Sequence, residues 1–253
     1  MKRPINALMA SVLAAGLACS GASASETLSG AYLAAKHAAT ISDVEEAAIY
    51  FSHALKRDPQ NPRLMEQAVI YLTAAGRVVD AIPIAKRLAA AQPNQRMSSL
   101  ILTADALKRG DFSVARSRLE GSPQAFHPLI AAMLDGWAAF GEGDQAGAEK
   151  AFTSLDDRPI FKIFSGYHIG LMRQAKGDTA GAVESFKSAV DEMDAASGRL
   201  ARAYAVALRA AGKDEEARKV YQDALGATLN DAELQAGLAS LDAGKAPKLL
   251  VET

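Results

Sequence analysis

Apolar and small residues recur every three or four positions along most of this 253-residue chain. They form segments of about a dozen residues, arranged in pairs with a tight turn between the two segments of each pair. This spacing places the apolar side chains on one face of a helix. The second segments of the first two pairs end at Asp58-Pro59 and Gln92-Pro93, and proline cannot continue a helix. The pattern therefore predicts an all-α chain built from helical hairpins.

The turn inside each hairpin carries a glycine at a nearly constant interval. The spacings are 34, 33, 34 and 35 residues, and the glycines are Gly76, Gly110, Gly143, Gly177 and Gly212. An alanine follows each of them five residues later, and an earlier copy has Ser42 in the glycine's place and Ala47 five residues on. Glycine accepts the left-handed conformation that ends a helix, and an aspartate directly after it caps the next helix. A regular period of this length predicts a solenoid of stacked repeats.

The individual repeat resembles a known family. A 34-residue helix–turn–helix unit with small residues at positions 8 and 20, an aromatic residue near 24 and proline at 32 resembles the tetratricopeptide repeat (TPR). Residues 28–61 carry these features as Ala35, Ala47, Phe51 and Pro59. Small residues at positions 8 and 20 let the paired helices approach closely, and Gly136 and Gly170 hold position 8 in the fourth and fifth copies.

The resemblance extends over residues 28–231 and implies an α-solenoid of about six TPR hairpins with a C-terminal capping helix. A TPR array over residues 25–244 divides into repeats at about 28–61, 62–95, 96–128, 129–162, 163–196 and 198–231, a cap over 232–244, and then a tail over 245–253. The second helix of the third repeat is expected to stop at Gly121-Ser122-Pro123, and the fourth repeat is expected to stop early, at Asp156-Asp157-Arg158-Pro159. We expect these irregular ends to be loop variations, with a change of superhelical pitch as the alternative.

The N-terminus has the features of a secretory signal peptide over residues 1–24. Lys2 and Arg3 precede an apolar stretch, and Ala22-Ser23-Ala24 forms a small-residue cleavage site before Ser25. The expected location is therefore outside the cytoplasm, in the periplasm of a Gram-negative bacterium. A lipoprotein acylated at Cys19, the only cysteine, is the alternative, and only such an anchor would place the protein at a membrane. Gly16 weakens this alternative, because an aliphatic residue usually lies three positions before such a cysteine.

Charge and motifs exclude several classes of function. The chain has 28 Lys and Arg against 29 Asp and Glu, so it lacks the basic footprint of a nucleic-acid-binding protein. The four histidines fall in different repeats, without the spacing of metal ligands, and no nucleophile or phosphate-binding motif is found. We therefore expect a protein without enzymatic activity, cofactor or metal. A cell-envelope enzyme that uses a groove carboxylate such as Glu66 is the less favoured alternative.

The TPR resemblance also implies where a partner binds, because the first helices of TPR hairpins line a concave groove. Residues at repeat positions 2, 5, 9, 12 and 13 point into that groove, which predicts an aromatic, methionine-containing centre and a basic C-terminal end. The candidate protein- or peptide-binding residues are Leu100, Leu107, Met133, Trp137, Phe140, Phe164, Tyr167, Arg199, Arg202 and Arg209.

The predicted function is that of an exported scaffold or adaptor that binds an apolar peptide segment with an acidic flank. Trp137 is the only tryptophan, and tryptophan and arginine are common binding anchors. Two other interpretations stay open for these residues: the aromatic side chains pack across the groove, or the arginines form a solvated helix face. Self-association through the groove or an end of the array is a further alternative for the partner.

Overall fold

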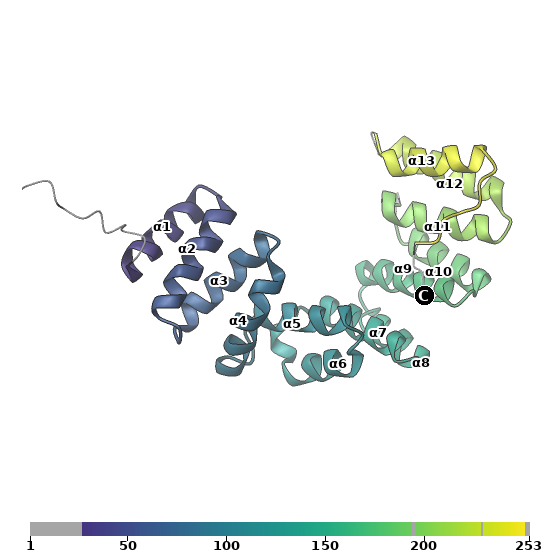
Figure 1. Cartoon of the computed structure of the whole chain (residues 1–253). Helices are drawn as coiled ribbons and strands as arrows, with labels where there is room; N and C mark the ends of the chain where they lie inside the picture. The colour runs from purple at the N-terminus through teal and green to yellow at the C-terminus, as the bar shows by residue number, and fades with distance from the viewer. Residues whose placement is uncertain (1–26, 194–195, 229, 251–253) are drawn as a thin grey trace, which may run out of the picture. The chain divides into compact units, whose positions relative to one another are not determined.

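The computed structural model describes residues 27–193, 196–228 and 230–250, and these residues form helices joined by turns and short loops. The expected signal peptide and Cys19 lie outside the described residues. The helices are α1 (Leu28–Thr40), α2 (Val44–Arg57), α3 (Pro62–Ala74), α4 (Val78–Ala91), α5 (Arg96–Lys108), α6 (Phe112–Gly121), α7 (Pro128–Gly141), α8 (Gln145–Phe152), α9 (Pro159–Ala175), α10 (Thr179–Asp191), α11 (Gly198–Ala210), α12 (Asp214–Ala227) and α13 (Ala232–Asp242). The predicted all-α architecture of six hairpins followed by one more helix is confirmed (Figure 1). None of the described helices is long and apolar enough to span a membrane.

The chain divides into two compact units, with the division inside α5. Unit 1 ends at Leu102 and contains α1 to α4 and the beginning of α5, and unit 2 starts at Thr103 and contains the remainder. In unit 1, Phe51 is fully buried and stacks on Tyr71 of the next hairpin, with ring centroids 5.1 Å apart. The aromatic residue at position 24 therefore joins its own hairpin to the following one, as in other stacked repeats.

The turns inside the hairpins have the conformation that the glycine interval predicts. The backbone φ is positive at Gly76, Gly110, Gly143, Gly177 and Gly212. Ser42 also has a positive φ, of 62°, so it replaces glycine in conformation as well as in position. The aspartates after these residues differ in function: Asp144 accepts from the backbone N–H of Gly147, whereas Asp111 makes no capping hydrogen bond and instead pairs with Arg109 at 3.2 Å.

In the fourth and fifth repeats, position 8 is glycine because an aromatic ring occupies the space beside it. A Cβ atom on Gly136 would lie 2.3 Å from Cε1 of Phe152, and one on Gly170 would lie 2.6 Å from Cε1 of Phe186. Phe152 and Phe186 are themselves buried. Each glycine thus lets the second helix of its hairpin insert a full aromatic ring against the first helix.

Two repeats in unit 2 are irregular. Helix α6 ends at Gly121, and the 3₁₀ helix η2 (Pro123–Ala125) and an extended Phe126 connect it to α7. Helix α8 has only eight residues, and the following α9 has seventeen because it starts at Pro159, four residues before the expected repeat boundary at 163.

The residues after α13 return to the array. Gly244 has a φ of 64°, and Lys245 to Leu250 then pass across α11 (Figure 1). The guanidinium of Arg209 donates to the main-chain oxygen of Lys245. Leu250 packs against the core cluster that includes Leu171, Leu200, Tyr204 and Leu208. The expected tail, as far as the structure describes it, is therefore attached to the last hairpins.

Candidate functional site

The candidate site lies on the first helices of unit 2. Helix α7 contacts α9, α9 contacts α11, and α11 contacts α13, so the first helices of successive hairpins are neighbours. We call the side formed by α7, α9 and α11 the first-helix face. It carries eight of the candidate residues, namely Met133, Trp137, Phe140, Phe164, Tyr167, Arg199, Arg202 and Arg209.

A pocket of about 190 Å³ opens between α9 and α11 on this face. Three candidate residues, Phe164, Tyr167 and Arg199, line it together. Its remaining lining residues are Ile163, His168, Ser197 and Leu200. Phe164 is 41% exposed and Arg199 is also exposed, so apolar surface and a positive charge are accessible at the same place.

One wall of the pocket rests on an aromatic cluster around Trp137. The Trp137 ring meets Phe140, Phe152 and His168 at nearly perpendicular or tilted angles, with centroid distances of 5.7, 5.8 and 5.9 Å. Its indole N–H donates to Nδ1 of His168 at 2.9 Å. The polar atom of Trp137 is therefore satisfied inside the protein, and the side chain is half-buried. This arrangement gives Trp137 a supporting position behind the pocket.

His168 is held in its neutral form by its surroundings. Burial and the nearby charge of Arg199 lower the pKa of His168 from 6.5 to about 4. Its ring stacks on Phe152 at 5.6 Å and meets Tyr167 edge-on at 5.2 Å. A neutral imidazole that accepts on Nδ1 carries its hydrogen on Nε2. At neutral pH, the positive charge at the pocket therefore comes from Arg199 alone among the described lining residues.

The three arginines expected at the basic end have different environments. Arg199 is exposed and makes no ion pair with a described residue, whereas Arg202 is half-buried and pairs with Glu233 of α13. Arg209 is 9% exposed and bonds to the main chain of the C-terminal segment. Only Arg199 thus combines exposure with a position at the pocket.

Of the remaining candidate residues, Met133, Phe140 and Leu107 pack against core clusters and Leu100 does not. Met133 and Phe140 lean against the cluster around Phe152, and the Nζ of Lys176 lies 5.2 Å from the centre of the Phe140 ring. Leu107 packs against Ala106 and Ala115, and Leu100 belongs to unit 1, where it is partly exposed.

The described residues contain no group of three potential metal ligands. Glu66, the carboxylate named for the enzyme alternative, accepts a 3.0 Å hydrogen bond from Nε2 of Gln95. The pocket itself offers apolar surface, the hydroxyls of Tyr167 and Ser197, the imidazole of His168 and the guanidinium of Arg199.

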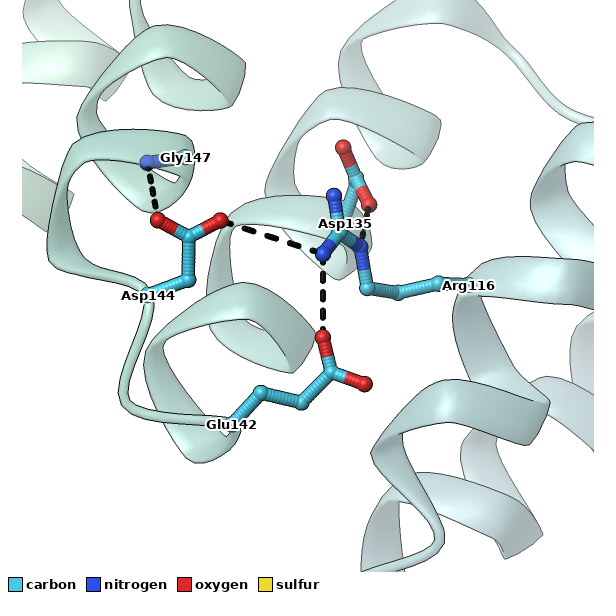
Figure 2. Close-up of polar contacts among 5 residues, drawn as sticks. All are labelled: Arg116, Asp135, Glu142, Asp144 and Gly147. Atoms are coloured by element: carbon cyan, nitrogen blue, oxygen red, sulfur yellow. Dashed lines mark hydrogen bonds and ion pairs between the residues drawn. The ribbon is translucent and has the colours of Figure 1, made fainter.

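A polar cluster joins three helices elsewhere in unit 2 (Figure 2). Arg116 of α6 donates from Nε to Asp135 of α7 and from Nη1 to Glu142, both at 2.9 Å. Asp144, the N-cap of α8, lies 4.0 Å from the same Nη1 and accepts from the N–H of Gly147. The hydrogen bonds to Glu142 and Asp135 raise the pKa of Arg116. One guanidinium thus connects two consecutive hairpins, beside an open hollow of about 780 Å³ between α6 and α8.

The family comparison agrees with the geometry, since residues 32–96 match the tetratricopeptide repeat family model. Residues 32–96 are therefore tetratricopeptide repeats. The structure of PilW, a widely conserved type IV pilus biogenesis factor, is similar with a TM-score of 0.62 and 16% identity, over 83% of this chain and 98% of PilW. MamA from Desulfovibrio magneticus RS-1 has a TM-score of 0.53 and 22% identity, over 65% of this chain and 94% of that chain.

A third similar structure is the Cut9–Hcn1 hetero-tetramer of the APC/C, with a TM-score of 0.54 and 16% identity. The match covers 85% of this chain and 43% of that chain, so the TPR array spans less than half the length of this relative. No curated protein matches the sequence significantly. The predicted TPR solenoid is confirmed by the family match and these shared folds.

Sequence reasoning did not identify four of the pocket residues: Ile163, His168, Ser197 and Leu200. His168 was grouped with isolated histidines because its partner is 31 residues away, in the preceding TPR hairpin. The repeat register could have indicated this contact, because position 9 of one first helix lies against position 6 of the next first helix. Trp137 and His168 hold these two positions.

Proposed function

We propose that this chain is an exported, non-enzymatic TPR scaffold that binds a protein or peptide partner on the first-helix face of unit 2. The TPR fold supports the general role, because TPR arrays are protein-interaction scaffolds. The observation that carries the specific site is the pocket at which Phe164 and Arg199 are exposed side by side.

The pocket favours a particular kind of partner segment. Its size and apolar lining fit one aliphatic or aromatic side chain, and Arg199 at its edge favours an acidic residue or a terminal carboxylate next to that side chain. Because His168 stays neutral down to about pH 4, it adds no second charge near neutral pH. We therefore propose an apolar anchor followed by one acidic group as the recognised feature.

Photo-crosslinking tests this site directly. A photoreactive phenylalanine analogue replaces Phe164 in one variant and Val79 in another, and both proteins are irradiated in cells. Val79 is a matched control because it is 80% exposed and belongs to the second helix α4. We expect a discrete adduct from position 164 that is absent from position 79.

Charge reversal then tests the recognition chemistry. Arg199→Glu in the position-164 variant should remove the adduct, whereas Lys219→Glu, at an exposed residue of α12, should leave it unchanged. An adduct that survives Arg199→Glu would contradict the proposed acidic feature, and equal adducts from 164 and 79 would contradict the site.

The exported location is tested on the N-terminus of the purified native protein. Export with cleavage at the predicted site gives a mature chain that starts at Ser25 and is recovered with the periplasmic contents. A chain that starts at an acylated Cys19 would support the lipoprotein alternative, and an intact Met1 would contradict export.

A further inference from the structure

The C-terminal segment, Lys245 to Leu250, contacts α11 through Arg209, one of the predicted binding residues. Arg209, which contacts this segment, was itself expected to point into the groove. The segment contains Pro247, which has no N–H to donate to a helix, and it crosses α11 in non-helical form (Figure 1). A stretch of non-helical chain therefore already contacts a side chain that was predicted to bind a partner.

Arg209 explains why a main chain is bound there. Its side chain is more than nine-tenths buried, yet it forms no ion pair with a described carboxylate. Its guanidinium donates to the oxygen of Lys245, and its buried Nε–H has no acceptor among the described residues. Burying a guanidinium is costly unless acceptors are supplied. The carbonyl of Lys245 supplies one acceptor and the hydroxyl of Tyr221 another, so the segment satisfies part of the hydrogen-bonding capacity of this buried guanidinium.

The far end of the segment packs against an apolar cluster that extends from α13 to the pocket. Leu250 packs against a cluster that contains Leu200, and Ile163 and Tyr167 pack against the same cluster. All three also line the pocket between α9 and α11. Leu249, by contrast, is 38% exposed. Leu250 thus attaches the segment to the cluster, whereas Leu249 does not.

We propose that the C-terminal segment is an intramolecular ligand of α11, recognised by Arg209 through the Lys245 carbonyl and by the apolar cluster through Leu250. A partner that continues from the pocket along α11 as far as Arg209 must displace it. The displacement rests on the proposed function, whereas recognition of the segment does not and can be tested without any partner.

The test uses a synthetic peptide with the sequence of residues 245–253, titrated calorimetrically into full-length chains. In the wild-type protein the attached segment competes at a high effective concentration, so the free peptide should bind weakly or not at all. Leu250→Asp weakens the attached segment, and we expect this variant to bind the peptide at least tenfold more tightly than the wild type. Leu249→Asp introduces the same charge at the exposed neighbour and should bind the peptide as weakly as the wild type.

A change in the peptide tests the contact with Arg209 without altering the protein. Replacing the amide bond between Lys245 and Ala246 by a carbon–carbon double bond removes the acceptor and keeps the shape of the chain. Binding of this peptide to Leu250→Asp should fall at least tenfold. Undiminished binding would overturn the assignment to Arg209, and failure of Leu250→Asp to bind the natural peptide would overturn the intramolecular ligand.

Competition with a partner has a separate readout. Leu250→Asp should increase the yield of the crosslinked adduct from position 164, and Leu249→Asp should not. If the peptide binds as expected but no adduct forms at position 164, the proposed function fails and the intramolecular ligand stands. If the adduct forms but the peptide does not bind, the opposite conclusion holds.

Discussion

The indole N–H of Trp137 and the Nδ1 of His168, 2.9 Å apart, form a hydrogen bond between the first helices of two consecutive repeats. The bond requires a neutral imidazole, because a protonated ring has no free acceptor. The buried position of His168 and the charge of Arg199 both favour this neutral form. Helix contact and protonation state are therefore linked at this residue.

This link predicts that unit 2 loses stability on acidification between pH 6.5 and about 4. In this range the unfolded histidine binds a proton and the folded one, with its pKa lowered to about 4, does not. Since the unfolded state binds more protons, the free energy of unfolding rises with pH across the window. The full effect is on the order of 3 kcal/mol.

Urea denaturation followed by circular dichroism at several pH values measures this effect. His168→Asn keeps an acceptor near Nδ1 but cannot titrate, so it serves as the reference. The stability difference between the wild type and this variant should grow as pH rises from 4.5 to 7. A constant difference would show that His168 does not carry the pH dependence.

Gly136→Ala should destabilise the protein by about 1–3 kcal/mol, because the new methyl group would overlap the buried Phe152 ring. Gly226→Ala is the matched control, since this helical glycine has nothing within 4 Å of the added atom. There, helix propensity should stabilise the protein by about 0.5–1 kcal/mol. Thermal unfolding of both variants tests the pair, and effects of the same sign would contradict the packing explanation.

Arg116→Met should lower the free energy of unfolding by about 1–2 kcal/mol, since Asp135 and Glu142 lose a shared, partly buried donor. Lys219→Met removes one exposed pair with Asp223 and should change stability by less than about 0.5 kcal/mol. The loss at Arg116 should also shrink in high salt. Urea titrations at low and high ionic strength compare the two, and equal losses would argue against a special contribution of the cluster in Figure 2.

Ser42→Gly should stabilise unit 1 by about 0.5 kcal/mol. Relief of the left-handed backbone strain exceeds the entropy that glycine adds to the unfolded chain. The reverse change, Gly110→Ser, should destabilise the chain by about 1 kcal/mol, because the φ of Gly110 is 78°. Melting temperatures of the two variants should move in opposite directions, and a destabilised Ser42→Gly would contradict this account.

The fold was predictable from the sequence because its determinants are local and repeated. The regular spacing of glycines such as Gly110 and Gly143 indicates where the turns lie, and small residues such as Gly136 indicate where paired helices approach closely. Where the repeat is irregular, the prediction was less accurate. Helix α9 starts at Pro159 instead of near 163, since the shortened α8 leaves additional residues for the next first helix.

The site was predicted only in part, because exposure depends on contacts that no local pattern contains. Arg199 and Arg209 have the same residue type and lie on the same helix, but only Arg209 is covered, by a segment 36 residues further along the chain. Likewise, the position of Trp137 in the repeat could not show that its indole N–H is hydrogen-bonded to His168. The repeat register predicted which residues lie on the first-helix face, but it did not predict which of their side chains are buried or hydrogen-bonded.

The position of Trp137 makes the protein its own optical sensor. It is the single tryptophan of the chain, and it contacts His168 in the wall of the pocket while lying behind it. Its emission reports on one hydrogen bond between two repeats, without a label and without overlap from another indole. A molecule that enters the pocket and shifts His168 would therefore change the colour or intensity of this light without touching the residue that emits it.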